Sequence, residues 1–206
     1  MNTLESLSTQ VQELIKNDSA HDFSHIMRVY KNAQQIAEYE KANKKLVLAS
    51  VLLHDIVQFP KSDKRSQTAS IKSAQMAEKI LTKYDFTKKE IKIISDAIRD
   101  HSYSRKKVPK TLVGKILQDA DRLDALGAIG IARTFSVGGS EKRKLYNESD
   151  PFCKKRKPDD KSWTVDHFYQ KLLLLEKNMH TVYAQKEAKR RTKYMRSFIA
   201  ELKKEI

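Results

Sequence analysis

The chain has 206 residues and a formal net charge of +15, with 39% hydrophobic and 33% charged residues. This apolar content can form one sizeable core, or a core with a helical appendage, and excludes two large domains. Five Gly and four Pro are too few for the many turns of a sandwich or barrel, so the composition favours long helices.

Apolar residues recur at helical spacing along most of the sequence, and this periodicity predicts the helices in chain order. The expected helices cover residues 3–17, 25–37, 45–56, 69–81, 88–101, 111–135, 164–179 and 182–204. Ser24 is the expected N-cap of the second helix. The segment 45–56 is strongly apolar and has few β-branched residues, so we expect a buried helix there and not a strand.

Two features interrupt this pattern in the second half of the chain. Gly127 and Gly130 lie inside the segment 111–135, which predicts close helix packing or a kink. Residues 137–160 are polar and aperiodic, as is typical of a functional or mobile loop. We therefore expect one all-α domain over residues 1–206, with a core at about 20–135, an irregular insertion at 136–160 and C-terminal helices at 161–206 packed on the core.

Cysteine usage and hydropathy indicate where the protein works. Cys153 is the only cysteine, so neither an internal disulfide nor a cysteine-rich zinc site can form. The first residues lack the basic start and apolar run of a signal peptide. The longest apolar run, residues 46–53, is too short to span a bilayer. We expect a reduced, cytoplasmic protein with no membrane partner.

The excess of positive charge indicates a class of partner without selecting one. A net charge of +15 attracts phosphorylated small molecules, nucleic acid and anionic lipid alike. The basic run from Lys186 to Lys204 is interpreted as a solvated helix face, which is the usual role of such runs. Nucleic acid therefore stays possible as a partner. The sequence does not define the oligomeric state, and a homodimer is one alternative.

Two histidines and two aspartates form the constellation that carries chemistry. His25 lies early on one expected helix, His54 and Asp55 end the apolar segment, and Asp121 lies among apolar residues. Burying an ionised carboxylate is costly unless it is paired or bound to a cation. Two imidazoles and two carboxylates suit a divalent transition metal that keeps positions open for water and substrate.

In this order the four residues resemble the H…HD…D signature of the HD-domain metal-dependent phosphohydrolases. The final aspartate stands in the Ala-Asp-Arg-Leu context of residues 120–123, which is similar to that of the family. Further stretches resemble the YedJ/YpgQ-like branch of bacterial HD proteins. These stretches are residues 54–57, 97–104, 118–130, 150–152 and 166–168.

The resemblance implies an HD-domain helical bundle with additional C-terminal helices and a metal between the central helices. It implies that the four residues hold a divalent ion, which could be Mn, Mg, Co, Fe or Zn. It also implies a catalytic role for Asp55. Asp119 and Asp121 point in different directions on a helix, and the family context selects Asp121. The implied reaction is hydrolysis of a nucleotide, with release of pyrophosphate from a nucleoside triphosphate as the first to test. The Gly-Tyr-Pro extension of cyclic-dinucleotide phosphodiesterases is absent.

Other residues have candidate roles in holding substrate or moving protons, each beside an ordinary structural role. His21 could donate a proton to the leaving group. Arg28 could hold a phosphate through two hydrogen bonds or orient a metal-binding carboxylate. Lys61 and Arg65 lie in the polar stretch just after the His–Asp pair, where family members often contact phosphates. His101 could bind phosphate, act as an acid, ligate a second metal, or merely stabilise its helix end.

The region around the insertion adds weaker candidates. Asp124 could orient the attacking water or a ligand histidine. Aromatic and basic residues of the insertion could cover a bound nucleotide, whereas Trp163 is expected to pack at the edge of the core. These residues are Tyr146, Phe152, Lys154, Lys155, Arg156 and Trp163.

Three alternative functions stay open on the sequence alone. One is a phosphatase or phosphodiesterase acting on monophosphates or oligonucleotides. Another is a basic nucleic-acid-binding helical protein whose metal site is vestigial. The third is a di-iron oxygenase, which would need His101 and further ligands for a second metal.

Overall fold

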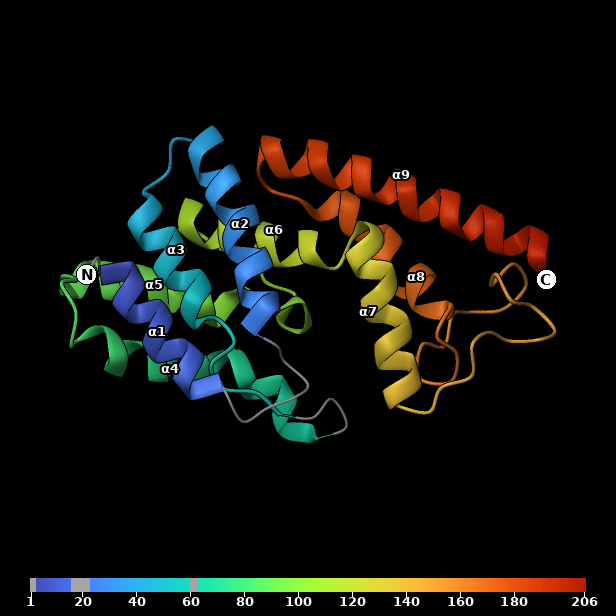
Figure 1. The fold of residues 1–206 in the computed structure, drawn as a ribbon, viewed down its shortest axis with the longest axis horizontal. Coiled ribbons are helices and arrows are strands. Elements are labelled where there is room, and N and C mark those ends of the chain that lie inside the picture. Colours follow the sequence, from blue (N-terminus) through green and yellow to red (C-terminus); the bar gives the residue numbers. More distant parts are fainter. Residues whose placement is uncertain (1–2, 16–22, 60–62) are drawn as a thin grey trace. The chain divides into compact units, whose positions relative to one another are not determined.

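The computed structural model describes residues 3–15, 23–59 and 63–206, and the regular elements within them are helical (Figure 1). The α-helices are α1 Thr3–Ile15, α2 Phe23–Tyr39, α3 Lys44–Leu53, α4 Ala69–Leu81, α5 Lys88–Asp100, α6 Leu112–Asp124, α7 Gly127–Ser140, α8 Asp166–Gln170 and α9 Val182–Glu205. Short 3-10 helices cover Lys64–Thr68, Tyr103–Arg105 and Leu172–Asn178. The described residues form an isolated bridge between Lys144 and Trp163 but no strand, which confirms the all-α prediction.

The chain forms two compact units, Met1–Asp121 and Arg122–Ile206. The first unit contains α1 to α5 and most of α6, and the second contains α7 to α9 with the long connection before α8. The single-domain organisation expected above stays a prediction. None of the described helices is both long enough and apolar enough to cross a bilayer.

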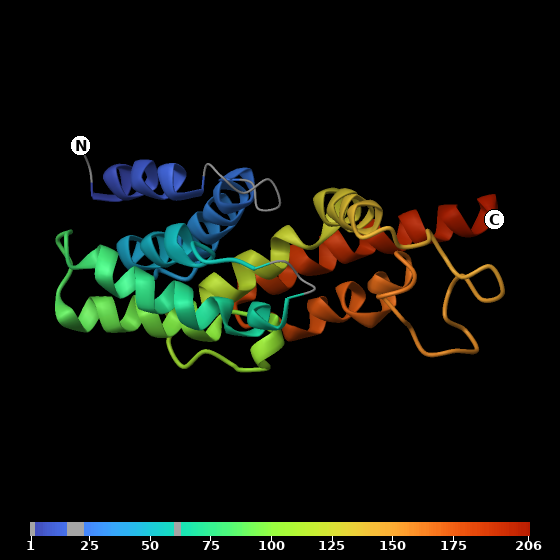
Figure 2. The same cartoon turned by 90° about the horizontal axis from the view of Figure 1, so that it is seen from below.

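Helix α3 is the centre of the first unit. Every residue from Leu46 to Leu53 is buried, and α1, α2 and α5 all pack against this helix. Its start is fixed by Asn43, whose side chain accepts a hydrogen bond from the Leu46 N–H at 3.2 Å. Figure 2 shows α4 and α5 side by side along this unit. The buried helix predicted at residues 45–56 is confirmed, and it ends at Leu53, directly before His54 and Asp55.

The start of α5 is equally well defined. Thr87 and Glu90 form a capping box, in which each side chain accepts a hydrogen bond from the other residue's backbone N–H. The helix then runs to Asp100, so that His101 falls at its C-cap. The capping box fixes the first residue of the helix, and His101 follows its last residue, Asp100.

The expected helix over residues 111–135 is broken into α6 and α7. Gly127 adopts φ +74°, a left-handed conformation that ends the first helix and starts the second. At Gly130 a Cβ atom would lie 2.2 Å from the carbonyl oxygen of Ala125, so only glycine fits there. The kink predicted from the two glycines is therefore present, and it lies just after Asp121.

We expect Gly130→Ala to lower the free energy of unfolding by about 2 kcal/mol, because the added methyl group meets backbone that cannot move aside. Urea unfolding followed by circular dichroism measures the change. Gly139→Ala is the matched control on α7, since a Cβ at Gly139 meets nothing within 4 Å. The control is expected to be neutral or to stabilise by up to about 1 kcal/mol. Equal destabilisation by both variants would contradict the prediction.

Three expected boundaries differ from those observed. Helix α2 is described from Phe23, so Ser24 lies within its first turn, where its hydroxyl accepts a hydrogen bond from Arg28 at 2.9 Å. Helix α7 extends to Ser140, beyond the expected start of the insertion, and at Gly138 it lies so close to Thr164 that a Cβ atom would be 2.2 Å from the Thr164 Oγ1. The helix expected at 164–179 is divided into α8 and a 3-10 helix, since Lys171 at φ −139° leaves the helical range.

Candidate metal centre

Two histidines occupy the same local position at the ends of two packed helices. His54 is the C-cap of α3 and His101 is the C-cap of α5. The Nδ1 atom of His54 lies 2.7 Å from the Val51 carbonyl oxygen, and that of His101 lies 2.6 Å from the Ile98 carbonyl oxygen. A carbonyl oxygen can only accept a hydrogen bond. Each Nδ1 therefore donates a hydrogen bond to its carbonyl, which in the neutral ring leaves Nε2 with a free lone pair.

These Nε2 atoms face a carboxylate that the chain places next to His54. Asp55 Oδ2 lies 3.6 Å from His54 Nε2, and Asp55 Oδ1 lies 3.6 Å from His101 Nε2. The rings of His54 and His101 are edge to face, with centroids 5.0 Å apart. His54 and His101 are buried, while the Asp55 side chain is 26% exposed. The cluster can thus be reached from outside at its carboxylate.

Helices α2 and α6 add the other half of the cluster. His25 Nε2 lies 3.6 Å from Asp121 Oδ1, and the His25 ring centroid is 5.6 Å from that of His54. The two helices are joined by the Asn32 side chain, which donates a hydrogen bond to the Ala120 carbonyl at 3.3 Å. The structure thus places Asp121 at the cluster, whereas Asp119 is buried and does not belong to the grouped donors.

The charges in the cluster oppose one another in a way that suits a cation. Burial lowers the pKa of His54 and outweighs the nearby carboxylates, so its imidazole is neutral. Burial would raise the pKa of Asp55, but the imidazoles of His54, His101 and His25 outweigh it and hold that pKa well below its usual range. For His101, burial works against the charged form, and the Asp55 carboxylate overcomes it to raise the pKa. The result is a neutral imidazole at His54 and an ionised carboxylate at Asp55, with His101 able to hold a proton beside that carboxylate.

The donor atoms fit a metal ion in both spacing and chemistry. Among the described residues, one candidate group contains His25, His54 and Asp121, and a second contains His54, Asp55 and His101. Within each group the donor atoms lie within 4.8 Å of one another, close to the separation of about 4.4 Å that ligands of one ion can have. His54 belongs to both groups, and its Nε2 atom is buried and has no hydrogen-bond partner. A buried acceptor without a partner is costly, and a metal ion would satisfy it.

The expected substrate-holding residues are less well supported by contacts. Arg28 lies one turn after His25 on α2 and donates to Ser24. Arg65 is bound to Asp63 through two hydrogen bonds of 2.7 and 2.9 Å, and its guanidinium lies 4.8 Å from the Phe59 ring centroid. The phosphate-binding roles of both arginines stay predictions. His21 and Lys61 lie outside the described residues.

Residues of the second unit that were candidates for function have structural partners. Asp124 is buried and forms an ion pair with Arg133 of α7, so its role in orienting water stays a prediction. Arg156 donates to both carboxylate oxygens of the buried Asp166, and its guanidinium lies 4.5 Å from the Trp163 ring centroid. Arg156 and Trp163 therefore belong to the framework of the connection before α8.

The same framework explains two of the stretches that resemble the family. The carboxylate of Asp150 accepts hydrogen bonds from the backbone N–H groups of Lys154 at 2.9 Å and Lys155 at 2.7 Å. The carboxylate of Asp166 accepts from the Asp159 N–H at 2.7 Å in addition to Arg156. Both aspartates thus organise the loop. A nucleotide-covering role for the loop stays a prediction.

The sequence assigned no role to Gln118 beyond its place in the family-like stretch 118–130. In the structure its side chain forms hydrogen bonds that join separate segments. Its side-chain nitrogen lies within hydrogen-bonding distance of three carbonyl oxygens, at 3.2 Å from Asp100, 3.0 Å from His101 and 3.1 Å from Lys107. The residue is fully buried on α6, one turn before Asp121. It therefore couples the backbone at His101 to the helix that carries Asp121. The signal in the sequence was a glutamine three residues before the predicted ligand Asp121, within a helix of regularly spaced apolar residues.

We expect Gln118→Met to lower the free energy of unfolding by about 2 kcal/mol, because buried carbonyl groups lose their donor. Metal affinity is expected to fall by about 10- to 100-fold, as for other residues that orient metal ligands. Calorimetric titration with Mn²⁺ measures the affinity. Gln118→Glu keeps the size of the side chain but replaces the donor by a carboxylate, so it should not restore binding. Wild-type affinity in Gln118→Met would contradict this role.

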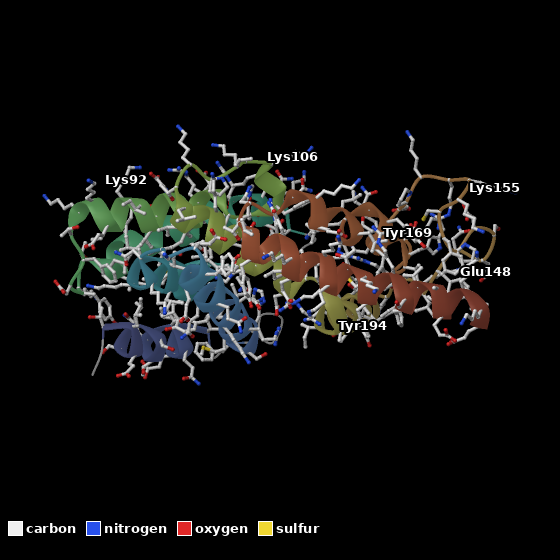
Figure 3. The ribbon with its side chains drawn as sticks, turned by 90° about the horizontal axis from the view of Figure 1, so that it is seen from above. Lys92, Lys106, Glu148, Lys155, Tyr169 and Tyr194 are labelled. Atoms are coloured by element: carbon white, nitrogen blue, oxygen red, sulfur yellow. The ribbon has the colours of Figure 1, made fainter. Side chains whose placement is uncertain are left out.

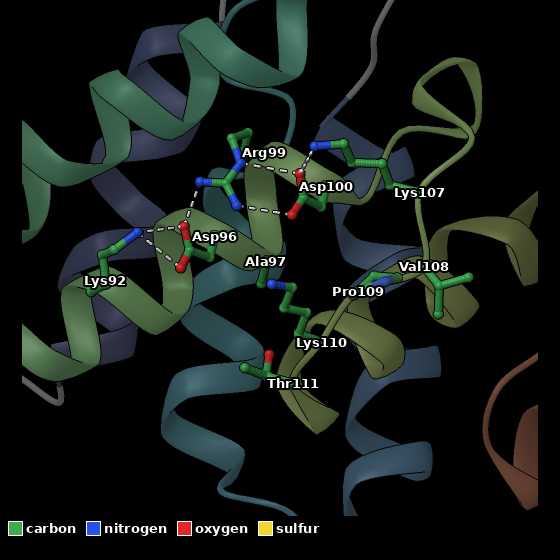
Figure 4. Close-up of a pocket in the computed structure, with 10 residues that line it drawn as sticks. All are labelled: Lys92, Asp96, Ala97, Arg99, Asp100, Lys107, Val108, Pro109, Lys110 and Thr111. Carbon is green, nitrogen blue, oxygen red and sulfur yellow. Dashed lines mark hydrogen bonds and ion pairs between the residues drawn. The ribbon is translucent and has the colours of Figure 1, made fainter.

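A separate cavity of about 480 Å³ lies beside α5 (Figure 4). It is lined by Lys92, Asp96, Ala97, Arg99, Asp100 and residues 107–111. Arg99 binds both aspartates, Lys92 pairs with Asp96 at 2.8 Å, and Lys107 lies 3.9 Å from Asp100. None of the grouped metal donors lines this cavity.

Comparison with known proteins adds a family to this geometry. The HD domain model matches residues 22–126. YpgQ of Bacillus subtilis is 32% identical over 207 residues, covering 98% of this chain and 93% of that protein. The crystal structure of Bacillus subtilis YpgQ in complex with ADP has a TM-score of 0.78 at 30% identity, covering 99% of this chain and 95% of that one. An HD-superfamily hydrolase of Bacillus thuringiensis has a TM-score of 0.77 at 34% identity, with 98% and 95% covered.

Proposed function

The chain belongs to the HD-domain family and is an HD-superfamily hydrolase, and from this premise we propose that it hydrolyses nucleotides at the His–Asp cluster of its first unit. The observation that carries the proposal is the buried, unpartnered Nε2 of His54 between Asp55 and the His25–Asp121 pair. The nucleotide class is supported by the relative YpgQ, whose crystal structure contains ADP. Within that class, the reaction we propose is release of pyrophosphate from a nucleoside triphosphate.

The proposed ligands of the metal are His25, His54, Asp55 and Asp121. A divalent ion held by them would activate water and neutralise the charge that develops on a phosphoryl oxygen. Asp55 and Asp121 supply the negative charge that balances the ion, and the imidazole nitrogens of His25 and His54 complete the set. The hydrogen bond from His54 Nδ1 to the Val51 carbonyl keeps the ring oriented toward the cluster.

His101 is proposed to act at the same centre. Its ring is fixed by the Ile98 carbonyl in the same way as that of His54, and its Nε2 points at Asp55. The raised pKa allows this ring to hold a proton beside the carboxylate, which suits donation to a departing phosphate or pyrophosphate. A place in the second group of metal donors is the alternative role.

Arg28 is the proposed phosphate-holding residue that is best placed by sequence, because it follows His25 by one helical turn on α2. Its guanidinium would exchange Ser24 for a phosphate oxygen. Arg65 would have to release Asp63 to do the same, so we expect it to contribute less.

The test uses purified, metal-stripped protein with a panel of nucleoside mono-, di- and triphosphates. Mn, Mg, Co, Fe or Zn is restored separately, and phosphate and pyrophosphate are measured side by side. Pyrophosphate formed only in the presence of a metal supports the proposal. Release of phosphate alone would identify a phosphatase instead, and no product from any nucleotide would overturn the nucleotide class.

A further inference from the structure

The solvent-facing side of α9 carries positively charged side chains over several turns. The exposed cations of its first two thirds are Lys186, Lys189, Arg190, Lys193 and Arg196. Between residues 186 and 196 they span about 15 Å of helix axis at 1.5 Å per residue. The opposite face of the helix is buried in the protein through Ala184, Ala188, Thr192 and Met195. The cations therefore lie on the side that faces solvent.

Negative charge is nearly absent from this stretch. The only acidic residue from 185 to 200 is Glu187, which binds Arg190 at 2.6 Å and Arg191 at 2.7 Å and has a pKa lowered to about 2 by the hydrogen bonds from these arginines. The side chains of Lys189, Lys193 and Arg196 form no ion pair with any described residue. Helix α5 shows the usual alternative, with Lys92 paired to Asp96 one turn later.

This arrangement is unfavourable for the isolated helix. Lys189 and Lys193, four residues apart, repel each other, and so do Lys193 and Arg196, three residues apart. A solvated helix face commonly alternates the two signs and avoids these costs. A bound polyanion would remove them all at once.

An exposed aromatic ring completes the surface. Tyr194, labelled in Figure 3, is 56% exposed and follows Lys193 on α9. Basic side chains that track phosphates, combined with an aromatic ring on which a base stacks, are typical of single-strand binding surfaces. An amphipathic helix that binds membranes inserts its apolar face into the lipid, and the apolar face of α9 is already buried in the protein.

We propose that this face of α9 binds single-stranded nucleic acid, with Lys189, Lys193 and Arg196 on the phosphodiester backbone and Tyr194 stacked on a base. The surface belongs to the second unit and contains none of the proposed metal ligands, so the inference does not depend on the proposed hydrolysis. Binding requires no metal and no turnover.

The test measures binding of fluorescent 20-nucleotide RNA, DNA and duplex DNA by the full-length protein, with vesicles of anionic lipid in a separate arm. We expect metal-independent binding to the single strands that weakens with salt. The triple variant K189Q/K193Q/R196Q should raise the single-strand Kd at least tenfold. Its slope of log K against log salt should fall by about 2, since each lost phosphate contact removes about 0.7.

The matched control is K79Q/K83Q/K89Q, which removes three exposed lysines from the first unit and changes the net charge equally. It should bind nearly as wild type, and Tyr194→Ala should weaken single-strand binding while leaving the salt slope unchanged. Circular dichroism checks that all variants are folded. Equal loss in the triple variant and the control would overturn the proposal. Absence of nucleic-acid binding, or binding to anionic vesicles alone, would overturn it as well.

Discussion

Replacing His54 and Asp55 together by alanine is expected to reduce metal-dependent hydrolysis by more than about 100-fold, because changes to groups that merely orient a metal ligand already cost 10- to 100-fold. The double variant removes a donor shared by both candidate metal groups together with the carboxylate between His54 and His101. Helical content should stay near that of the wild type, since α3 ends at Leu53, before both substitutions. Product release and circular dichroism measure the two effects.

The control for this variant is another His–Asp pair. His167 and Asp160 lie 2.7 Å apart in the second unit and belong to neither candidate metal group. The double substitution of these two residues by alanine is expected to retain hydrolysis. Full activity in the His54/Asp55 variant, or equal loss in both variants, would contradict the assignment of the metal centre.

Asp166→Asn is expected to lower the free energy of unfolding by about 3 kcal/mol, and the melting temperature by about 6 to 12 °C. Asp166 is fully buried, and its carboxylate binds Arg156 through both oxygens and the Asp159 N–H. A neutral amide leaves the positive charge of Arg156 without compensation in a partly buried site. Thermal and urea unfolding measure the loss.

The comparison for Asp166 is an ion pair of the same unit that lies in water. Glu201 and Lys204 are 2.8 Å apart, with side chains that are 61% and 71% exposed. Glu201→Gln is expected to cost less than about 1 kcal/mol. If Asp166→Asn cost no more than this control, the network around Asp166 would not stabilise the connection before α8.

Much of the fold could be predicted because its signals are local. The apolar run 46–53 predicted a buried helix, and the two glycines predicted the break between α6 and α7. The division of the helix expected at 164–179 could not be read from periodicity. Its apolar spacing is helical, and only the backbone conformation of Lys171 separates α8 from the 3-10 helix.

The candidate site could be predicted only in part. His25, His54, Asp55 and Asp121 are ordered in the sequence as in the family. The structure places His25, His54 and Asp121 in one donor group and Asp55 with His54 in a second. The contact between His101 and Asp55 depends on how α3 and α5 pack, which spacing along the chain does not contain. The interactions of Gln118 join carbonyl groups from separate segments, so only the folded chain gives them.

The basic run at the C-terminus shows the same limit from another side. The sequence predicted a solvated helix face from Lys186 to Lys204, and these side chains are indeed largely exposed. Only the structure shows which face of α9 is buried, and therefore which basic side chains share the exposed face. Glu187 is the only acid among residues 185–200, and the acids of the last turns, Glu201 and Glu205, lie beyond that stretch.

The most direct test of the central claim is a metal titration of the stripped protein. Bound Mn²⁺ per chain and the initial rate of nucleotide hydrolysis are measured on the same samples. We predict that the rate rises in proportion to occupancy and that the His54/Asp55 double variant neither binds the metal tightly nor turns over. Undiminished hydrolysis by the stripped protein in the presence of a chelator would contradict a metal-dependent reaction at this centre.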